Sequence, residues 1–123
     1  MMSLVRSRDT KPEMLVRRLV HRLGYRYRLH RRDLPGVPDL VFSSRQRVIF
    51  VNGCFWHGHS CRWGRIPKSH VEYWEQKIGR NRQRVQQNLR KLRRMKWKCL
   101  VLWECELEKI DAITSRIIRF LDA

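Results

Sequence analysis

Apolar residues recur at intervals of three and four near both ends of the chain, and this spacing predicts a helix at each end. The first helix is expected over residues 10–24, because Thr10 and Glu13 form a capping-box pattern and Gly24 marks the end. A second apolar stripe predicts a terminal helix over residues 113–121. The apolar positions of the first helix are Leu15, Val16, Leu19, Val20 and Leu23.

A longer stretch, residues 69–95, carries the same helical spacing. It opens with Ser69 and Glu72, which repeat the capping-box pattern. Its apolar positions are Trp74, Ile78, Val85, Leu89 and Leu92. Gly79 lies inside this pattern. Because glycine weakens a helix interior, we expect it to divide the stretch into two helices.

Four short segments have the composition of strands. Residues 25–30 alternate aromatic or apolar with basic side chains, which predicts a half-exposed strand. The sequence DLPGVPD then predicts a turn, and residues 40–42 and 48–51 predict a β-hairpin. Residues 99–103, CLVLW, predict a buried strand. The order α-β-β-β-α-β-α indicates an α/β fold with a mixed central sheet, and we expect residues 1–123 to form a single domain.

The balance of charged residues indicates which kind of partner the protein binds. The chain has 28 Lys and Arg residues against 11 Asp and Glu residues, a formal net charge of +17. This excess favours a polyanionic partner. Nucleic acid is preferred over an anionic membrane, because no helix combines a broad apolar face with lysines opposite it. No apolar run reaches membrane-spanning length and no leader-type apolar region begins the chain, so we expect a cytoplasmic protein.

Cysteines and histidines are concentrated in the segment VNGCFWHGHSC, residues 51–61. Cys54, His59 and Cys61 offer three metal ligands within one loop, and Cys105 follows the last predicted strand. A Cys3His set suits a tetrahedral structural zinc site. The spacing leaves His57 as an alternative to His59, so the sequence predicts the site without choosing between the two histidines.

Two further residues suggest catalysis. Asp39 opens a strand, where a carboxylate is well placed to hold Mg²⁺, and His57 is suited to general-base work. Taken singly, Asp39 is explained as a turn residue, His57 as a surface histidine, and Glu13 as a helix cap. Taken together with the basic composition, Asp39 and His57 indicate metal-assisted hydrolysis of phosphodiesters.

Five segments, in this order and spacing, resemble the very-short-patch-repair (Vsr-type) mismatch endonucleases. They are RDTKPE, LPGVPDLVF, VNGCFWHGHSC, EYWEQKIGRN and VLWEC. The resemblance covers nearly the whole chain, and the stretch GCFWHGHSC is highly specific. It implies a restriction-endonuclease-like α/β fold with a structural zinc. It also implies Mg²⁺-dependent nicking of double-stranded DNA beside a T:G mismatch in DNA repair, by a monomer with repair proteins as candidate partners.

The resemblance also assigns roles to individual residues. Asp39 is the implied Mg²⁺ carboxylate, and Val51 supplies its backbone carbonyl as a further Mg²⁺ ligand. His57 is the implied general base, and Glu13 an accessory acid. The implied zinc ligands are Cys54, His59, Cys61 and Cys105. The implied DNA contacts are Met2, Phe55, Trp56, Trp74, Lys77 and Asn81, with the three rings as a wedge and the last two residues reading the mismatch.

The chain departs from the best-known family pattern in two places, and from the wider fold in one. Val51 and Asn52 stand where that pattern has Thr-His, which keeps a backbone ligand and removes a histidine. The acidic-x-Lys motif of the wider fold is missing, which fits His57 as the base. The segment before the first helix is short, with Met2 at the place of an inserting methionine, so we expect reduced DNA affinity or mismatch preference.

Two rival functions remain at this stage. One is a nuclease of the same fold without mismatch specificity. The other is a zinc-stabilised DNA-binding module without catalysis. Asp39 and His57 argue against the second, because a protein that only binds DNA needs neither.

Overall fold

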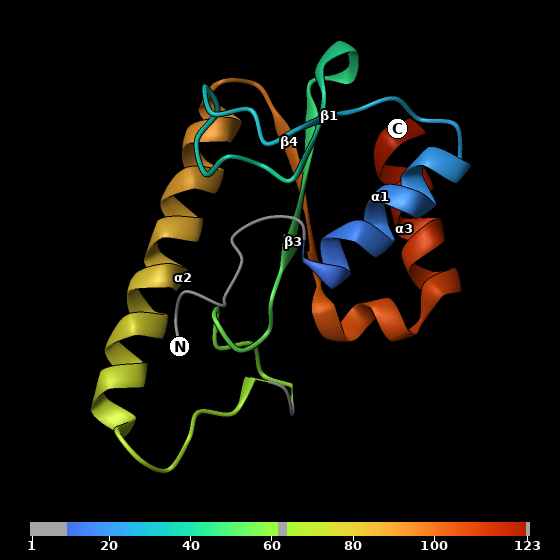
Figure 1. Ribbon diagram of the computed structural model, residues 1–123. Coiled ribbons are helices and arrows are strands. Elements are labelled where there is room, and N and C mark those ends of the chain that lie inside the picture. Colours follow the sequence, from blue (N-terminus) through green and yellow to red (C-terminus); the bar gives the residue numbers. More distant parts are fainter. Residues whose placement is uncertain (1–9, 62–63, 123) are drawn as a thin grey trace.

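Two helices cover one face of a central sheet, and one long helix covers the other (Figure 1). The computed structural model describes residues 10–61 and 64–122. Its helices are α1 (Lys11–Arg22), α2 (Val71–Arg94) and α3 (Ile110–Asp122), and its strands are β1 (Arg28–Leu29), β2 (Leu40–Phe42), β3 (Arg47–Asn52) and β4 (Lys98–Trp103). Short 3-10 turns, η2 (Ser43–Arg45) and η4 (Glu104–Glu108), follow β2 and β4. No helix in the described part of the chain has both the length and the apolar character needed to cross a bilayer.

The strands form one mixed sheet in the order β1-β2-β3-β4. β2 and β3 are antiparallel, with Leu40 opposite Ile49, and η2 joins them. β3 and β4 are parallel, with Val51 opposite Leu102, and α2 lies in the long connection that parallel strands require. The predicted α/β class, the mixed sheet and the hairpin are therefore confirmed.

Alternation along β2 and β3 divides the core into two clusters. Leu40, Phe42 and Ile49 belong to the larger cluster with α1 and α3, whereas Val41 and Val48 belong to the smaller one with α2. The larger cluster also contains Val16, Leu19, Val20, Leu102, Leu107, Ile113, Ile117 and Leu121. The smaller cluster also contains Leu34 and Leu92. Because each face of the sheet is apolar, each needs its own layer of helix.

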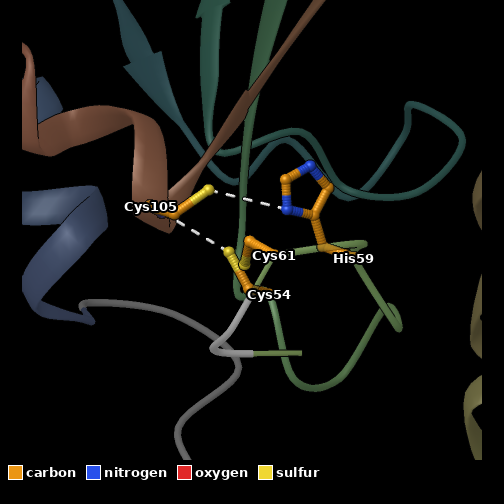
Figure 2. Close-up of side chains that lie close together, drawn as sticks. All are labelled: Cys54, His59, Cys61 and Cys105. Carbon is orange, nitrogen blue, oxygen red and sulfur yellow. Dashed lines mark hydrogen bonds between the residues drawn. The ribbon is translucent and has the colours of Figure 1, made fainter. Parts of the chain in front are cut away.

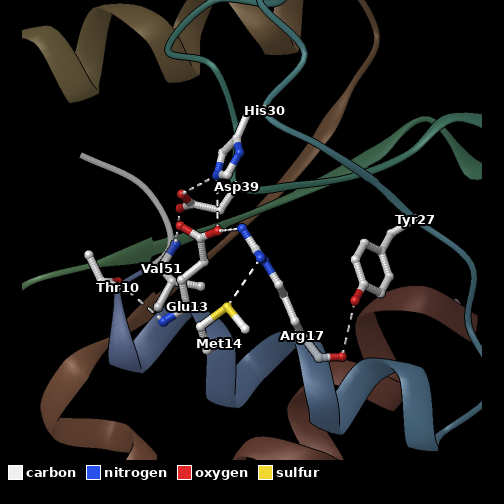
Figure 3. Close-up of polar contacts among 8 residues, drawn as sticks. All are labelled: Thr10, Glu13, Met14, Arg17, Tyr27, His30, Asp39 and Val51. Atoms are coloured by element: carbon white, nitrogen blue, oxygen red, sulfur yellow. Dashed lines mark hydrogen bonds and ion pairs between the residues drawn. The ribbon is translucent and has the colours of Figure 1, made fainter. Parts of the chain in front are cut away.

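Helix α1 begins as predicted, but Glu13 differs from its predicted role as a cap. The Glu13 backbone N–H donates a hydrogen bond to the Thr10 hydroxyl at 3.4 Å, so Thr10 is the N-cap. The Glu13 side chain does not turn back to the cap. It is buried, with 1% of the residue exposed, and its carboxylate points toward Asp39 and His30 (Figure 3).

Helix α2 is continuous, so the prediction that Gly79 divides it was wrong. The apolar face that includes Ile78, Leu89 and Leu92 is buried, and this packing outweighs the helix propensity of one glycine, about 1 kcal/mol. The predicted Ser69 cap was also wrong. Helix α2 starts after His70, which has a left-handed backbone and makes no side-chain capping bond.

The first and last strands differ from their predictions in extent and burial. Within residues 25–30, only Arg28–Leu29 pairs with β2. Tyr25 and Tyr27 pack against the larger core cluster, so at these positions the side chains are held by packing and the backbone does not pair with β2. β4 lies at the edge of the sheet, and Leu102 alone among its residues is fully buried.

Candidate active site and metal centre

Four side chains of types that can bind a metal, from two distant parts of the chain, meet beyond the ends of β3 and β4 (Figure 2). The loop after β3 contributes three of them and η4 the fourth, namely Cys54, His59, Cys61 and Cys105. Their ligand atoms lie within 4.8 Å of one another, and the three cysteines are free thiols. Sulfur atoms about 2.3 Å from a tetrahedral zinc ion are about 3.8 Å apart. The cluster therefore has the size and the soft donors that zinc requires.

Local contacts hold this Cys/His cluster together. The Cys105 backbone N–H donates to Cys54 Sγ at 3.4 Å, and Cys105 Sγ lies 3.5 Å from His59 Nδ1. Burial raises the pKa of the Cys54 thiol to about 12 and also raises the pKa of Cys105. A bound dication reverses this effect because it stabilises the thiolates.

Trp103, at the end of β4, contacts the two loop histidines in different ways. Its ring stacks on His59, with centroids 4.3 Å apart and planes at 18°. The His57 ring meets Trp103 in a T-shaped contact at 5.9 Å. The Trp103 backbone N–H donates to Glu106 Oε1 at 2.9 Å, and Arg116 donates to Glu106 Oε2 at 2.6 Å. The structure thus places His59, and not His57, among the cysteines.

A second group combines two carboxylates with an imidazole (Figure 3). Glu13 comes from α1, His30 follows β1, and Asp39 precedes β2, and one ligand atom of each lies within 4.8 Å of the others. His30 Nε2 is 2.9 Å from Glu13 Oε2 and 3.9 Å from Asp39 Oδ1. Arg17, one turn further along α1, forms an ion pair with Glu13.

The environment of Asp39 favours a bound cation. Its side chain is 14% exposed, and its Oδ2 accepts a hydrogen bond from the Val51 backbone N–H at 2.7 Å. Burial raises the pKa of Asp39 to about 7, and the Glu13 carboxylate adds to the rise, although Val51 and Arg17 oppose it. Two carboxylates this close repel each other when both are ionised. A divalent cation between them removes that repulsion.

His57 lines the same cleft as Asp39 and Glu13. Burial lowers the pKa of its imidazole, and the nearby Arg84 lowers it further, so the ring is neutral at pH 7. Its Nδ1 is buried and has no hydrogen-bond partner among the described residues. A neutral imidazole at the wall of a cleft is suited to accept a proton.

The cleft has a volume of about 510 Å³ and brings the acidic group and the loop histidine to one place. Helix α2 forms one of its walls, through Asn81, Val85, Asn88 and Leu89. The solvent face of the same helix is strongly basic, with exposed Arg80, Arg82, Arg84, Arg90, Lys91, Arg93 and Arg94. Such a face is suited to the phosphates of a nucleic acid.

Phe55, Trp56 and Trp74 form one aromatic cluster between the loop and α2. The Phe55 ring lies 5.0 Å from Trp56 and 5.1 Å from Trp74, and the two tryptophans are 5.9 Å apart. All three are half-buried. The Lys77 ammonium lies 5.6 Å from the centroid of the Trp56 ring. The rings support one another and still reach solvent.

Asn81 ties the loop to α2. Its Nδ2 donates to the Trp56 carbonyl oxygen at 2.9 Å, and its Oδ1 accepts a hydrogen bond from Arg84. Each end of the amide therefore has a protein partner, and the group also has a second N–H and a second oxygen lone pair with which to bind a ligand.

Most of the predicted site residues lie in one of three groups: the Cys/His cluster, the acidic cleft or the aromatic cluster. Met2 lies outside the described residues. Sequence reasoning missed His30, Arg17 and Trp103. A signal for His30 was available, because antiparallel pairing of the predicted strands 25–30 and 40–42 brings the end of the first beside Asp39.

Paired carboxylates and a histidine in a cleft, beside a basic helix, suit the class of DNA endonucleases. Sequence comparison agrees: a family model described as "DNA mismatch endonuclease Vsr" matches residues 1–63. The chain belongs to the Vsr family of DNA mismatch endonucleases.

Three relatives align along almost all of the chain. Type II nicking enzyme V.XorIIP of Xanthomonas oryzae pv. oryzae is 52% identical over 99% of this chain and 90% of its own length. Type II nicking enzyme V.NmeAIP of Neisseria meningitidis is 41% identical over 95% of this chain and 84% of its own. DNA mismatch endonuclease Vsr of Escherichia coli is 36% identical over 94% of this chain and 78% of its own.

Proposed function

We propose that residues 1–123 form a single endonuclease domain that nicks double-stranded DNA beside a T:G mismatch with Mg²⁺. The observation that carries the proposal is the meeting of Glu13, Asp39 and His57 on one cleft, with the basic helix α2 as its wall. The names of the relatives, which include nicking enzymes and a mismatch endonuclease, support strand nicking and mismatch recognition.

Asp39 and the backbone carbonyl of Val51 are the proposed Mg²⁺ ligands, with Glu13 as an accessory acid. Their oxygen atoms fit the donor preference of Mg²⁺, and the crowding of the two carboxylates favours a cation. When bound, the ion polarises water and offsets negative charge on the phosphate. Val51 also orients Asp39 through its backbone N–H.

His57 is the proposed general base. It takes a proton from the water whose oxygen attacks the phosphorus atom, while the bond from phosphorus to one bridging oxygen breaks. Its place in the wall of the cleft that Asp39 and Glu13 also line, and its contact with Trp103, support this role.

Zinc is the proposed ion of the Cys/His cluster, and its role is structural. Cys54, His59 and Cys61 lie in a loop with little regular structure, and Cys105 lies beyond the end of β4. Joining them to one ion fixes the loop that carries His57, Phe55 and Trp56. In a chain this small, such a link adds directly to the stability of the fold.

Mismatch preference is assigned to Phe55, Trp56 and Trp74 as a wedge, with Lys77 and Asn81 contacting the exposed bases. Unstacking a base step costs a few kcal/mol, and it costs least where the pair is already weak. The half-buried rings are supported on α2 and held by Asn81, so they can enter DNA without being ordered first.

The test uses zinc-loaded protein, Mg²⁺ and two duplexes that differ only in one T:G pair. We expect one nick beside the mismatch, none after chelation of Mg²⁺, and none with Asp39→Asn, which keeps the shape of the side chain. Equal cutting of both duplexes would favour a nuclease without mismatch specificity. Tight DNA binding with no cutting under any divalent ion would favour a DNA-binding module.

A further inference from the structure

His30 owes its place in the acidic group to the register of the sheet. Leu29 pairs with Leu40, so the next residue, His30, falls opposite Asp39. At His30 the backbone turns to a φ of 48°, which ends β1. The imidazole lies beside the Glu13 and Asp39 carboxylates (Figure 3).

The separations in this group match those within the coordination shell of a small cation. Ligands about 2.1 Å from a six-coordinate ion are about 3.0 Å apart when adjacent and about 4.2 Å apart when opposite. His30 Nε2 is 2.9 Å from Glu13 Oε2 and 3.9 Å from Asp39 Oδ1. One ion can therefore contact all three side chains after small rotations.

Two buried polar atoms in this region have no hydrogen-bond partner within the part of the chain that the structure describes. His30 Nε2 is buried, and its contact with Glu13 does not have hydrogen-bond geometry. Asn52 is 8% exposed and lines the cleft with Asp39, and its Nδ2 has no hydrogen-bond partner among the described residues. Native structures leave few such atoms, since each costs about 1–3 kcal/mol. A metal ion bound to His30 Nε2 accounts for the first atom, and an acceptor oxygen in the cleft, such as that of a metal-bound water or a phosphate, accounts for the second.

We propose that His30 is a third side-chain ligand of the catalytic ion and that its nitrogen shifts the preference of the site from Mg²⁺ toward Mn²⁺. The inference rests on the proposed metal site at Asp39 and Glu13. Carboxylate, carbonyl and water oxygens suit Mg²⁺ and Mn²⁺ alike, whereas imidazole nitrogen suits transition ions. A site with one imidazole and two carboxylates therefore favours Mn²⁺ over Mg²⁺.

The test is direct detection of nitrogen bound to Mn²⁺ in the zinc-loaded full-length protein, by electron spin echo envelope modulation. We expect ¹⁴N modulation in the wild type, its loss in His30→Gln, and its retention in His21→Gln, a matched control at an exposed histidine of α1. His57→Gln should also retain it. Titration calorimetry should show the affinity of His30→Gln for Mn²⁺ reduced about tenfold or more, and its affinity for Mg²⁺ reduced less.

Labelling all histidines with ¹⁵N in the wild type supplies a readout that needs no substitution at His30, because the modulation changes if an imidazole is bound. No nitrogen modulation in the wild type, or modulation that persists in His30→Gln, would overturn the assignment. Asp39→Asn separates the two proposals. If it binds Mn²⁺ as tightly as the wild type, the metal site itself is misplaced. If it loses Mn²⁺ while His30→Gln behaves as wild type, the site stands and only the role of His30 falls.

Discussion

Gly58 is a position at which the loop that carries His57 and His59 is expected to be sensitive to a single methyl group. Its φ is +59°, in the left-handed region, and a β-carbon added there would lie 2.6 Å from Ile78 Cγ2 on α2. Ile78 is 6% exposed, so it has little room to move. We therefore expect Gly58→Ala to destabilise the protein and to displace the loop from α2.

The size of the effect follows from two separate costs. An L-residue in the left-handed region costs about 1–2 kcal/mol, and overpacking a well-filled contact costs about 1–3 kcal/mol. The free energy of unfolding of Gly58→Ala should thus fall by about 2–5 kcal/mol. Gly79 is the matched control, because it lies in the middle of α2 and no atom lies within 4 Å of an added β-carbon. Gly79→Ala should raise the free energy of unfolding by about 0.5–1 kcal/mol.

The assay is urea unfolding of the zinc-loaded variants at fixed zinc concentration, followed by tryptophan fluorescence. A double-mutant cycle with Ile78→Ala separates the two costs, because it removes the methyl group that the new β-carbon meets. In that background Gly58→Ala should lose only the backbone cost, about 1–2 kcal/mol. The reasoning is refuted if Gly58→Ala alone stays within about 0.5 kcal/mol of the wild type, or if its cost is the same in both backgrounds.

Three further outcomes are expected. His57→Ala should slow nicking by roughly 10²–10⁴-fold and keep its zinc, whereas His59→Ala should release zinc and unfold, as followed by metal analysis and melting; the opposite pattern would exchange the two assignments. The Kd for duplex DNA should rise steeply with salt, with a log–log slope that reflects several phosphate contacts, and a flat profile would contradict an electrostatic interface. Phe55→Ala combined with Trp56→Ala should retain zinc and lose the preference for T:G over matched duplex; unchanged discrimination with a large fall in Tm would assign these rings to packing alone.

The elements that sequence predicted well are those whose apolar pattern agrees with their burial. The hairpin of β2 and β3 and the helix α1 follow directly from local spacing. The errors occurred where tertiary packing outweighed a local preference. Gly79 is tolerated because the buried face of α2 supplies the stability, and residues 25–27 leave the ladder because Tyr25 and Tyr27 pack on the core instead. Propensity alone carries no information about either contact.

At the metal sites, local sequence indicates which residue types are present but not which of them meet in three dimensions. The sequence supplied the ligand types in residues 51–61, but His57 and His59 are equivalent in spacing and differ only in what they meet in three dimensions. Trp103 stacks on His59 and meets the edge-on ring of His57, and it comes from a strand about 45 residues further along the chain. A pattern confined to one loop cannot contain that distinction.

Glu13 has a local role in α1 and also belongs to the cleft. Its spacing from Thr10 is that of a capping box, and the backbone half of the cap is present. The side-chain half is not, because the carboxylate lies with Asp39 and His30. The start of a helix is a favourable place for an acid, since the helix dipole stabilises negative charge there. The same position thus satisfies the local rule for beginning α1 and brings a buried carboxylate to the cleft. A motif that is fully explained by local structure can therefore still hold a functional group, and burial without a capping bond is the observation that separates the two roles.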